Sequence, residues 1–307
     1  MFNQVALLAV CQALMLSTTS LVMTSSALVG LAIAPQSGLA TLPLAICYTT
    51  VMLVLIPVSL SMQRFGRKAG FAFGACTGIV GGLLAGYGIY TGNFVLFCIS
   101  AAFQGIAMAS GQFFRFAAAE VATTEYRSRA ISWVLAGGLV AAFIGPSLAR
   151  YTRDIQGLPP FTLSYSFIGL LSAGILICLF FLHLPKVVAE DHHEPRRSLA
   201  QILVIPTFIA AVVCAMIAYG SMNLLMTSTP LAMNARGLEF SQTATVIQWH
   251  IVGMFAPSFF TGSLIHKFGV FKIMIAGIVF LLICVISTLM GEGFENFLVS
   301  LICLGIG

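Results

Sequence analysis

Long apolar runs, separated by short polar or Gly- and Pro-containing breaks, make up almost the whole chain. About 20 consecutive apolar residues are enough for a helix to cross the hydrocarbon core of a bilayer. Each run therefore predicts a helical span, and the runs exclude a membrane β-barrel because they are continuous rather than alternating. The predicted spans are 4–31, 42–62, 70–90, 94–118, 130–150, 163–184, 202–229, 240–264, 272–290 and 296–307.

The last run is shorter than the others. As a helix, residues 296–307 reach only about 18 Å, which is too short to cross the hydrocarbon core. We therefore expect an all-α polytopic membrane protein with nine full spans and part of a tenth, cut off inside that tenth span. No basic segment precedes the first span, so we expect it to act as an uncleaved insertion signal.

Composition supports a chain that is solvated by lipid. Of its 307 residues, 59% are hydrophobic and only 7% are charged, and mean hydropathy is +1.04. A soluble domain carries about a quarter charged residues, so a soluble enzyme, a disordered chain and a nucleic-acid-binding module are excluded. The net charge of +5 is then best explained by loops that face the cytoplasm.

Basic residues are distributed unevenly between the two sets of loops. Loops after the even spans hold Arg64, Arg67, Lys68, Arg127, Arg129, Lys186, Arg196, Arg197, Lys267 and Lys272. Loops after the odd spans hold only Arg150, Arg153 and Arg236. Since cytoplasmic loops carry the excess of Lys and Arg, this predicts a cytoplasmic N-terminus in a bacterial-type inner membrane.

The longest polar run predicts a division into two halves. It gives an N-terminal bundle at 1–187, a cytoplasmic linker at 188–199 and a partial C-terminal bundle at 200–307. His192 and His193 lie in this run without a nearby cysteine, and the eight cysteines all lie in apolar runs, so we expect no metal site. No phosphate-binding glycine loop or catalytic cluster is visible. We therefore expect neither a cofactor nor an enzyme.

Two loop segments repeat at an offset of 203 residues. Residues 59–68 (SLSMQRFGRK) and 262–269 (GSLIHKFG) share a basic-Phe-Gly core, and each follows the second span of its half. This pattern is typical of parallel structural repeats, and it predicts loops that control conformational change. Their candidate residues are Gln63, Arg64, Gly66, Arg67, His266, Lys267 and Gly269.

On these segments the chain resembles the major facilitator superfamily. The family's loop motif reads roughly G-x-L-A-D-R-F-G-R-K, which residues 63–68 match in its second part. Residues 101–109 resemble its span-4 motif R-x-x-Q-G-x-G-x-A, residues 120–132 resemble the loop before span 5, and Gly145-Pro146 resembles its antiporter pair. The resemblance implies twelve spans in two bundles, with the substrate bound between them.

Departures from the family's motifs favour uptake over drug export. The loop aspartate is Gln63 in the first copy and His266 in the second, and the span-4 arginine is Ala101. Ser132 and Ala141 replace the earlier glycines of the antiporter motif. Residues 248–262 are similar to one bacterial branch of the family, whose members are proposed to carry vitamins such as riboflavin.

Glycines recur every four residues in the third span. Gly70, Gly74, Gly78 and Gly82 form one groove that lets a neighbouring helix approach closely. The groove is interpreted either as static packing or as a track along which helices slide. Gly145 and Pro146 are added as packing residues in the fifth span.

Polar side chains inside the spans are candidates for the substrate and proton pathway. Gln104, Gln112 and Arg115 share one predicted face of span 4, where Arg115 either meets substrate or extends to the headgroups. Asn223 belongs to a polar stripe in span 7 with Tyr219 and Thr227. In span 8, Gln248 flanks His250, which either exchanges protons or serves as a neutral core residue.

The expected function is secondary active transport of a small molecule by alternating access, as symport with protons. We expect the transporter to be a monomer and to bind no nucleic acid. Riboflavin is one candidate substrate. A non-transporting fragment of such a carrier and a drug or metabolite efflux antiporter are the alternatives within the family. A membrane enzyme or sensor is the alternative outside it.

Overall fold

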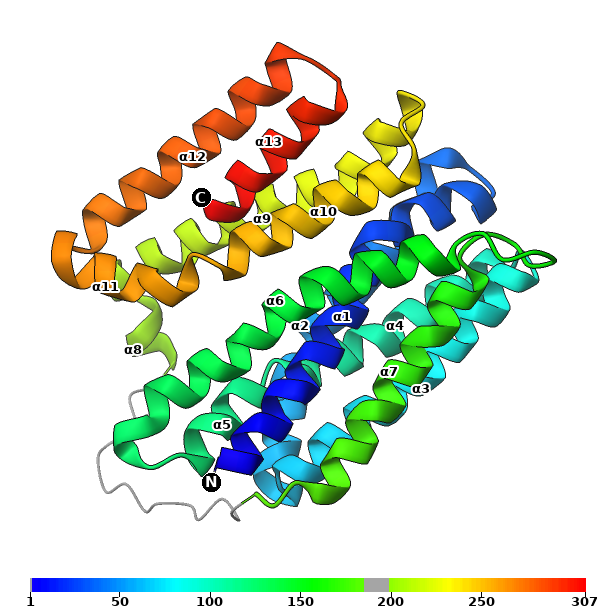
Figure 1. Cartoon of the computed structure of the whole chain (residues 1–307). Coiled ribbons are helices and arrows are strands. Elements are labelled where there is room, and N and C mark those ends of the chain that lie inside the picture. The colour runs from blue at the N-terminus through cyan, green and yellow to red at the C-terminus, as the bar shows by residue number, and fades with distance from the viewer. Residues whose placement is uncertain (1, 185–198) are drawn as a thin grey trace.

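A computed structural model describes residues 2–184 and 199–307, and within these ranges every regular element is a helix. Figure 1 shows two groups of helices lying side by side. The N-terminal group comprises α1 (Phe2–Ile33), α2 (Leu42–Phe65), α3 (Arg67–Tyr90), α4 (Phe94–Gly111), α5 (Phe114–Val121), α6 (Arg127–Thr152) and α7 (Thr162–Phe181), with short 3₁₀ turns at Ser37–Leu39 and Thr124–Tyr126. The C-terminal group comprises α8 (Leu199–Leu203), α9 (Pro206–Ala235), α10 (Phe240–Phe255), α11 (Ser258–Phe268), α12 (Val270–Met290) and α13 (Phe294–Ile306).

Every predicted span is helical, and three of them are interrupted. Within the described residues, eight helical stretches are long and apolar enough to cross a membrane. The fourth predicted span breaks at residues 112–113, the seventh at 204–205 and the eighth at Pro257. Proline explains two of these breaks, since it lacks an N–H group and is favoured at a helix start. The expected end of span 7 at residue 229 is wrong, because α9 continues through Pro230 to Ala235.

Most of the predicted linker lies outside the described residues. So do His192 and His193, and three of the basic residues counted for orientation: Lys186, Arg196 and Arg197. The linker assignment and the domain boundaries therefore stay predictions.

The two copies of the loop motif have the same backbone conformation. Gly66 joins α2 to α3 with φ 91° and ψ 152°, and Gly269 joins α11 to α12 with φ 86° and ψ 155°. This region of φ/ψ space is essentially restricted to glycine. The repeat seen in the sequence is thus also present in the backbone.

Small residues determine how closely the N-terminal helices pack. A methyl group on Gly145 would overlap Ser20 of α1, so α6 and α1 are in close contact there. Gly82 packs directly on the backbone of Gly169 in α7. Helices approach this closely in membranes where side chains are absent, because van der Waals contact replaces the hydrophobic driving force.

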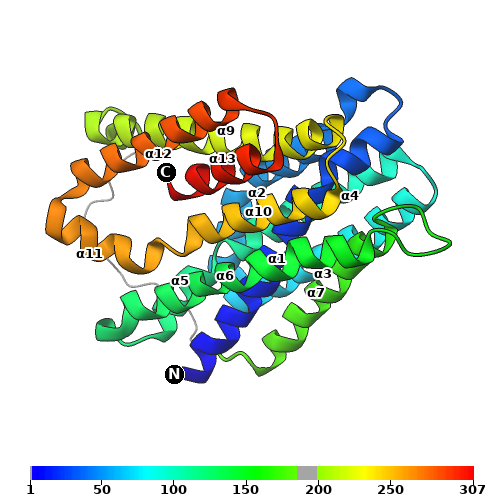
Figure 2. The same ribbon diagram turned by 45° about the horizontal axis from the view of Figure 1, so that its top comes forward.

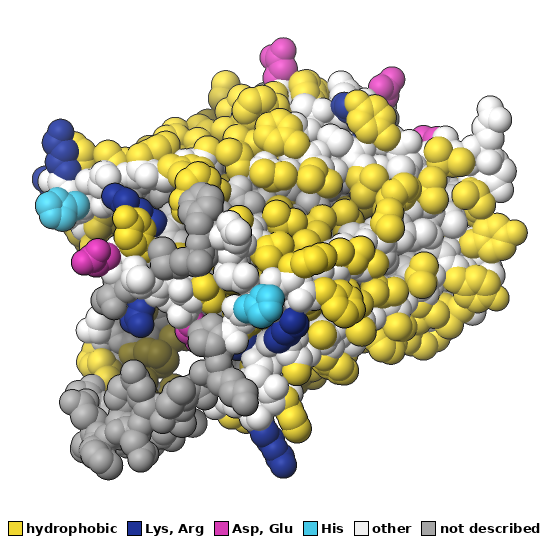
Figure 3. Space-filling view, turned by 60° about the horizontal axis from the view of Figure 1, so that its bottom comes forward, with side chains coloured by type: hydrophobic (Ala, Val, Ile, Leu, Met, Phe, Trp, Pro, Cys, Tyr) yellow, Lys and Arg dark blue, Asp and Glu magenta, His cyan; other side chains and the backbone are white. Residues whose placement is uncertain are grey.

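The helix ends define two ends of the molecule. One end, called the linker end below, contains the N-terminus, α5, α8 and α11. The opposite end, called the far end, contains the α1–α2, α3–α4, α6–α7, α9–α10 and α12–α13 connections (Figures 1 and 2). Figure 3 shows Lys and Arg side chains gathered toward one side of the molecule and a broad hydrophobic surface over the rest. This distribution is suited to a chain embedded in lipid.

Candidate functional site

The two halves meet along one seam. Its main contacts join α6 to α10, α1 to α9 and α1 to α10. Near the middle of α6, the ring of Phe255 rests on Gly138, where a methyl group would collide with it. One hydrophobic core combines residues of both halves, including Leu21 and Val22 from α1 with Met226 and Ile247 from α9 and α10.

The seam is closed toward the far end. Phe161, which precedes α7, and Phe240, which begins α10, pack edge to face with ring centroids 4.9 Å apart. At the linker end, by contrast, α11 contains no buried residue among those the structure describes. The halves are therefore in contact from the far end to the middle of the seam, and α11 lies away from that contact.

His250 connects α10 to α13. Its side chain is fully buried, and Nδ1 lies 2.8 Å from the carbonyl oxygen of Leu301. A carbonyl only accepts, so Nδ1 carries the hydrogen and donates it. Nε2 is buried and finds no hydrogen-bond partner in residues 2–184 and 199–307. Nε2 is therefore the ring nitrogen that carries the unprotonated lone pair.

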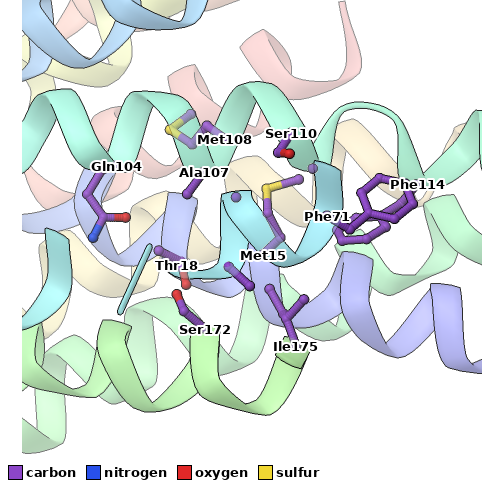
Figure 4. Close-up of a pocket in the computed structure, with 13 residues that line it drawn as sticks. Met15, Thr18, Phe71, Gln104, Ala107, Met108, Ser110, Phe114, Ser172 and Ile175 are labelled. Atoms are coloured by element: carbon purple, nitrogen blue, oxygen red, sulfur yellow. The ribbon is translucent and has the colours of Figure 1, made fainter. Parts of the chain in front are cut away.

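Gln104 points into a small cavity inside the N-terminal bundle rather than into the seam. Figure 4 shows it near Thr18 of α1 and Ser172 of α7. The cavity volume is about 20 Å³, enough for one water molecule. Nε2 of Gln104 donates to the carbonyl of Gly78 at 3.4 Å, and within the described part of the chain its Oε1 has no partner.

The structure separates Gln104 from the other candidates in span 4. Gln112 is half-buried at the break between α4 and α5, and Arg115 is exposed on α5 with its guanidinium 5.0 Å from the ring centroid of Phe116. The predicted span is interrupted at 112–113, so Gln104 lies in α4 and Arg115 in α5. A role for any of the three in the pathway remains a prediction.

Asn223 and Gln248 are half-buried on α9 and α10. Asn223 donates to the carbonyl of Tyr219 at 2.9 Å, and Tyr219 is exposed. Gln248 lies beside exposed Trp249 and not beside the buried contact of His250 with α13. The five polar candidates in the spans and Arg115 thus do not converge on one point, and their roles stay predictions.

The first loop motif is tied to its own half. Arg67 forms a bidentate ion pair with Glu120 of α5, and Lys68 donates to the carbonyl of Leu182 at 3.0 Å, just beyond α7. Gln63 and Arg64 are exposed. These contacts join the linker-end turns of α3, α5 and α7 into one unit.

The second loop motif is more open. His266 and Lys267 are exposed on the last turn of α11, with Lys267 placed 5.3 Å from the ring centroid of Phe268. The gating role predicted for both motifs is not tested by these contacts.

The glycine groove of α3, formed by Gly70, Gly74, Gly78 and Gly82, contacts three helices rather than one. Gly70 packs on Met62 of α2, and Gly74 packs on Ser110 of α4. Farther along α3, Gly78 and Gly82 pack on Ser172 and Gly169 of α7. The groove is therefore buried between neighbours and does not face lipid.

Three residues of the closed seam were not singled out from the sequence as site residues. From the sequence, Arg153 is only one of the basic residues that predict orientation. In the structure its guanidinium lies 5.4 Å from the ring centroid of Phe161 and 5.1 Å from that of Phe240. The pair of aromatic rings is separated by about 80 positions in the chain, so no local pattern reveals it. An arginine at the end of a span next to a Pro-Pro-Phe turn was the only available signal.

Comparison with known proteins identifies the family. The model of the Major Facilitator Superfamily matches residues 5–307. The chain belongs to the major facilitator superfamily. The riboflavin transporter RfnT of Brucella anthropi is 38% identical over 99% of this chain and 77% of its own length. The MFS-type transporter YddS of Bacillus subtilis is 28% identical over 89% of this chain and 66% of its own.

Solved structures show the same fold. The xylose transporter XylE from E. coli, in a partially occluded inward-open conformation, matches with a TM-score of 0.69 and 14% identity over 99% of this chain and 84% of that chain. The transporter FucP in an outward conformation matches with a TM-score of 0.62 and 16% identity, over 98% of this chain and 81% of that chain. The chain is therefore a polytopic membrane protein, as its apolar runs predict, and a transporter of this superfamily, as its motifs predict.

Proposed function

We propose that this transporter takes up riboflavin, or a closely similar planar heterocycle with a polyol side chain, across a bacterial plasma membrane. The observation that carries the proposal is its 38% identity to RfnT over nearly the whole chain. The substrate would bind between the halves near the bilayer midplane, as in other transporters built from two repeats. The departures at Ser132 and Ala141 favour uptake over antiport.

Proton coupling is the second part of the proposal. A proton gradient drives uphill uptake if one buried group binds a proton in step with substrate. His250 is the candidate group in this proposal, because Nδ1 donates to the carbonyl of Leu301 and Nε2 has no partner within the described residues. The functional unit is a monomer, since each half contributes helices to the seam within one chain.

The proposed orientation places the linker end in the cytoplasm. It follows from ten basic residues after the even spans against three after the odd spans. A reporter fused after Leu184 should therefore report a cytoplasmic position, and one fused after Asp154 an external position. The opposite result for both fusions would contradict the orientation and the assignment of inner and outer loops.

Transport of labelled riboflavin into liposomes that contain the purified chain tests the substrate assignment. Uptake that saturates, and that unlabelled riboflavin but not xylose or fucose reduces, is the expected result. Transport of a sugar in place of riboflavin would replace this proposal with another substrate class.

A further inference from the structure

The far end of the seam is closed by a stack of three side chains from both halves. Arg153 directly follows α6, Phe161 precedes α7, and Phe240 begins α10. The two rings pack edge to face at 4.9 Å, and the guanidinium lies within 5.4 Å of both ring centroids. Edge-to-face rings and cation–π pairs are attractive beyond the apolar area that they bury. The stack therefore adds a specific contact between the halves to the apolar core behind it.

Phe161 is held in an unusual conformation for this contact. Among residues 2–184 and 199–307, it is the one non-glycine residue with positive φ, at φ 69° and ψ −4°. Its N–H donates to the carbonyl oxygen of Arg153 at 2.9 Å, which closes the α6–α7 connection into a loop. A bulky residue in the left-handed region is strained and persists only where its surroundings fix it. Here the loop fixes the ring against Phe240.

A hollow opens beside the stack. Its volume is about 600 Å³, within the range of small-molecule sites. It lies between the far ends of α1, α3 and α9 and the α6–α7 loop, and Arg153 and Phe161 form part of its wall together with Tyr90, Pro159 and Asn234. Two residues of the stack, Arg153 and Phe161, are therefore accessible from this hollow.

We propose that Arg153, Phe161 and Phe240 form the far-end gate of the transport pathway, and that the hollow is the vestibule from which substrate reaches it. This inference rests on the proposed function, because a gate is needed only if the halves separate at this end. Phe161 and Phe240 belong to opposite halves, so their contact must break whenever the seam parts there. Arg153 lies near both rings, and its Nε is 3.5 Å from Oδ1 of Asp154.

Labelling of a reporter cysteine tests the gate without any transport assay. Ala244 is buried one turn along α10 from Phe240, within the core that the two halves share. In a purified full chain whose eight native cysteines are replaced by serine, Ala244→Cys should react slowly with a charged, water-soluble thiol reagent in detergent. Adding Arg153→Gln or Phe240→Leu should raise that rate about fivefold or more, since either change removes an aromatic or cation–π contact that holds the seam closed.

Matched controls separate a gate from general loosening. Arg150 lies one turn earlier in α6 and stacks on Tyr151 at 4.8 Å within its own half. Arg150→Gln therefore removes a similar cation–π pair but should leave the Ala244→Cys rate at the parental value. Phe240→Tyr keeps the ring and should restore slow labelling. Equal labelling in all variants, or an equal rise with Arg150→Gln, would overturn the gate.

The reporter experiment also remains informative if the substrate assignment fails. A parent protein that moves no riboflavin can still show the predicted labelling pattern, which would leave the gate intact and reject only the substrate. Parental transport with unchanged labelling in the Arg153 and Phe240 variants would reject the gate and leave the function standing.

Discussion

Replacing Gly82 with leucine is expected to abolish folding of the N-terminal bundle. Even a methyl group at this position would overlap the backbone of Gly169 in α7, and a backbone cannot rotate out of the way. Overpacking of a close contact costs about 1–3 kcal/mol and occasionally more. The destabilisation by leucine should exceed that range, because α3 and α7 would have to move apart. Their contact also includes Gly78, which packs on Ser172 of α7.

Gly220→Leu is the matched control for this substitution. Gly220 lies inside α9, a helix of similar apolar character, and an added Cβ there meets nothing within 4 Å. Leucine is also a better helix former than glycine by about 0.5–1 kcal/mol. We expect Gly220→Leu to purify as a single species with a thermal midpoint at or above the parental value. A monodisperse Gly82→Leu protein with the parental midpoint would refute the close α3–α7 contact.

His250→Asn should uncouple transport from the proton gradient while leaving the fold intact. The hydrogen bond from Nδ1 to Leu301 makes asparagine the appropriate replacement, because its amide nitrogen occupies the position of Nδ1. Asparagine has no titratable group, so it cannot carry a proton through the transport cycle. We therefore expect riboflavin binding and downhill exchange to persist at near-parental levels and uphill accumulation to be lost.

A second variant distinguishes coupling from structure at His250. His250→Leu removes the hydrogen-bond donor and leaves the carbonyl oxygen of Leu301 without this bond. We therefore expect lower thermal stability, and loss of riboflavin binding as well as of uphill accumulation. The parent's uphill uptake should vary with pH, and the exchange by His250→Asn should not. Uphill uptake by His250→Asn at the parental rate would remove His250 from the coupling mechanism.

The sequence predicts the arrangement of spans because apolar length and helix breakers are local properties. The repeated loop motif is likewise visible as a short run of residues, and Gly66 and Gly269 share one backbone conformation. The break at Pro257 lies inside the span predicted at 240–264, although proline is a known helix breaker. Pro230 shows the limit of this reasoning, since packing of buried Thr229 and Met233 keeps α9 helical beyond it.

Contacts between distant segments were not predictable in the same way. The partner of His250 is a backbone carbonyl, which no side-chain pattern encodes. A positive φ at Phe161 has no sequence signature, because aromatic residues rarely adopt it. The common face assigned to Gln104 and Arg115 assumed one straight helix, and the break between α4 and α5 divides it.

Riboflavin transport by this chain is tested most directly in liposomes. The decisive measurement is the initial rate of labelled riboflavin uptake into liposomes that contain the purified chain, compared with protein-free liposomes and with an imposed inward proton gradient. We expect saturable uptake that exceeds the protein-free rate and rises with the gradient. Uptake equal to that of protein-free liposomes, from a folded and correctly inserted protein, would contradict the proposed function.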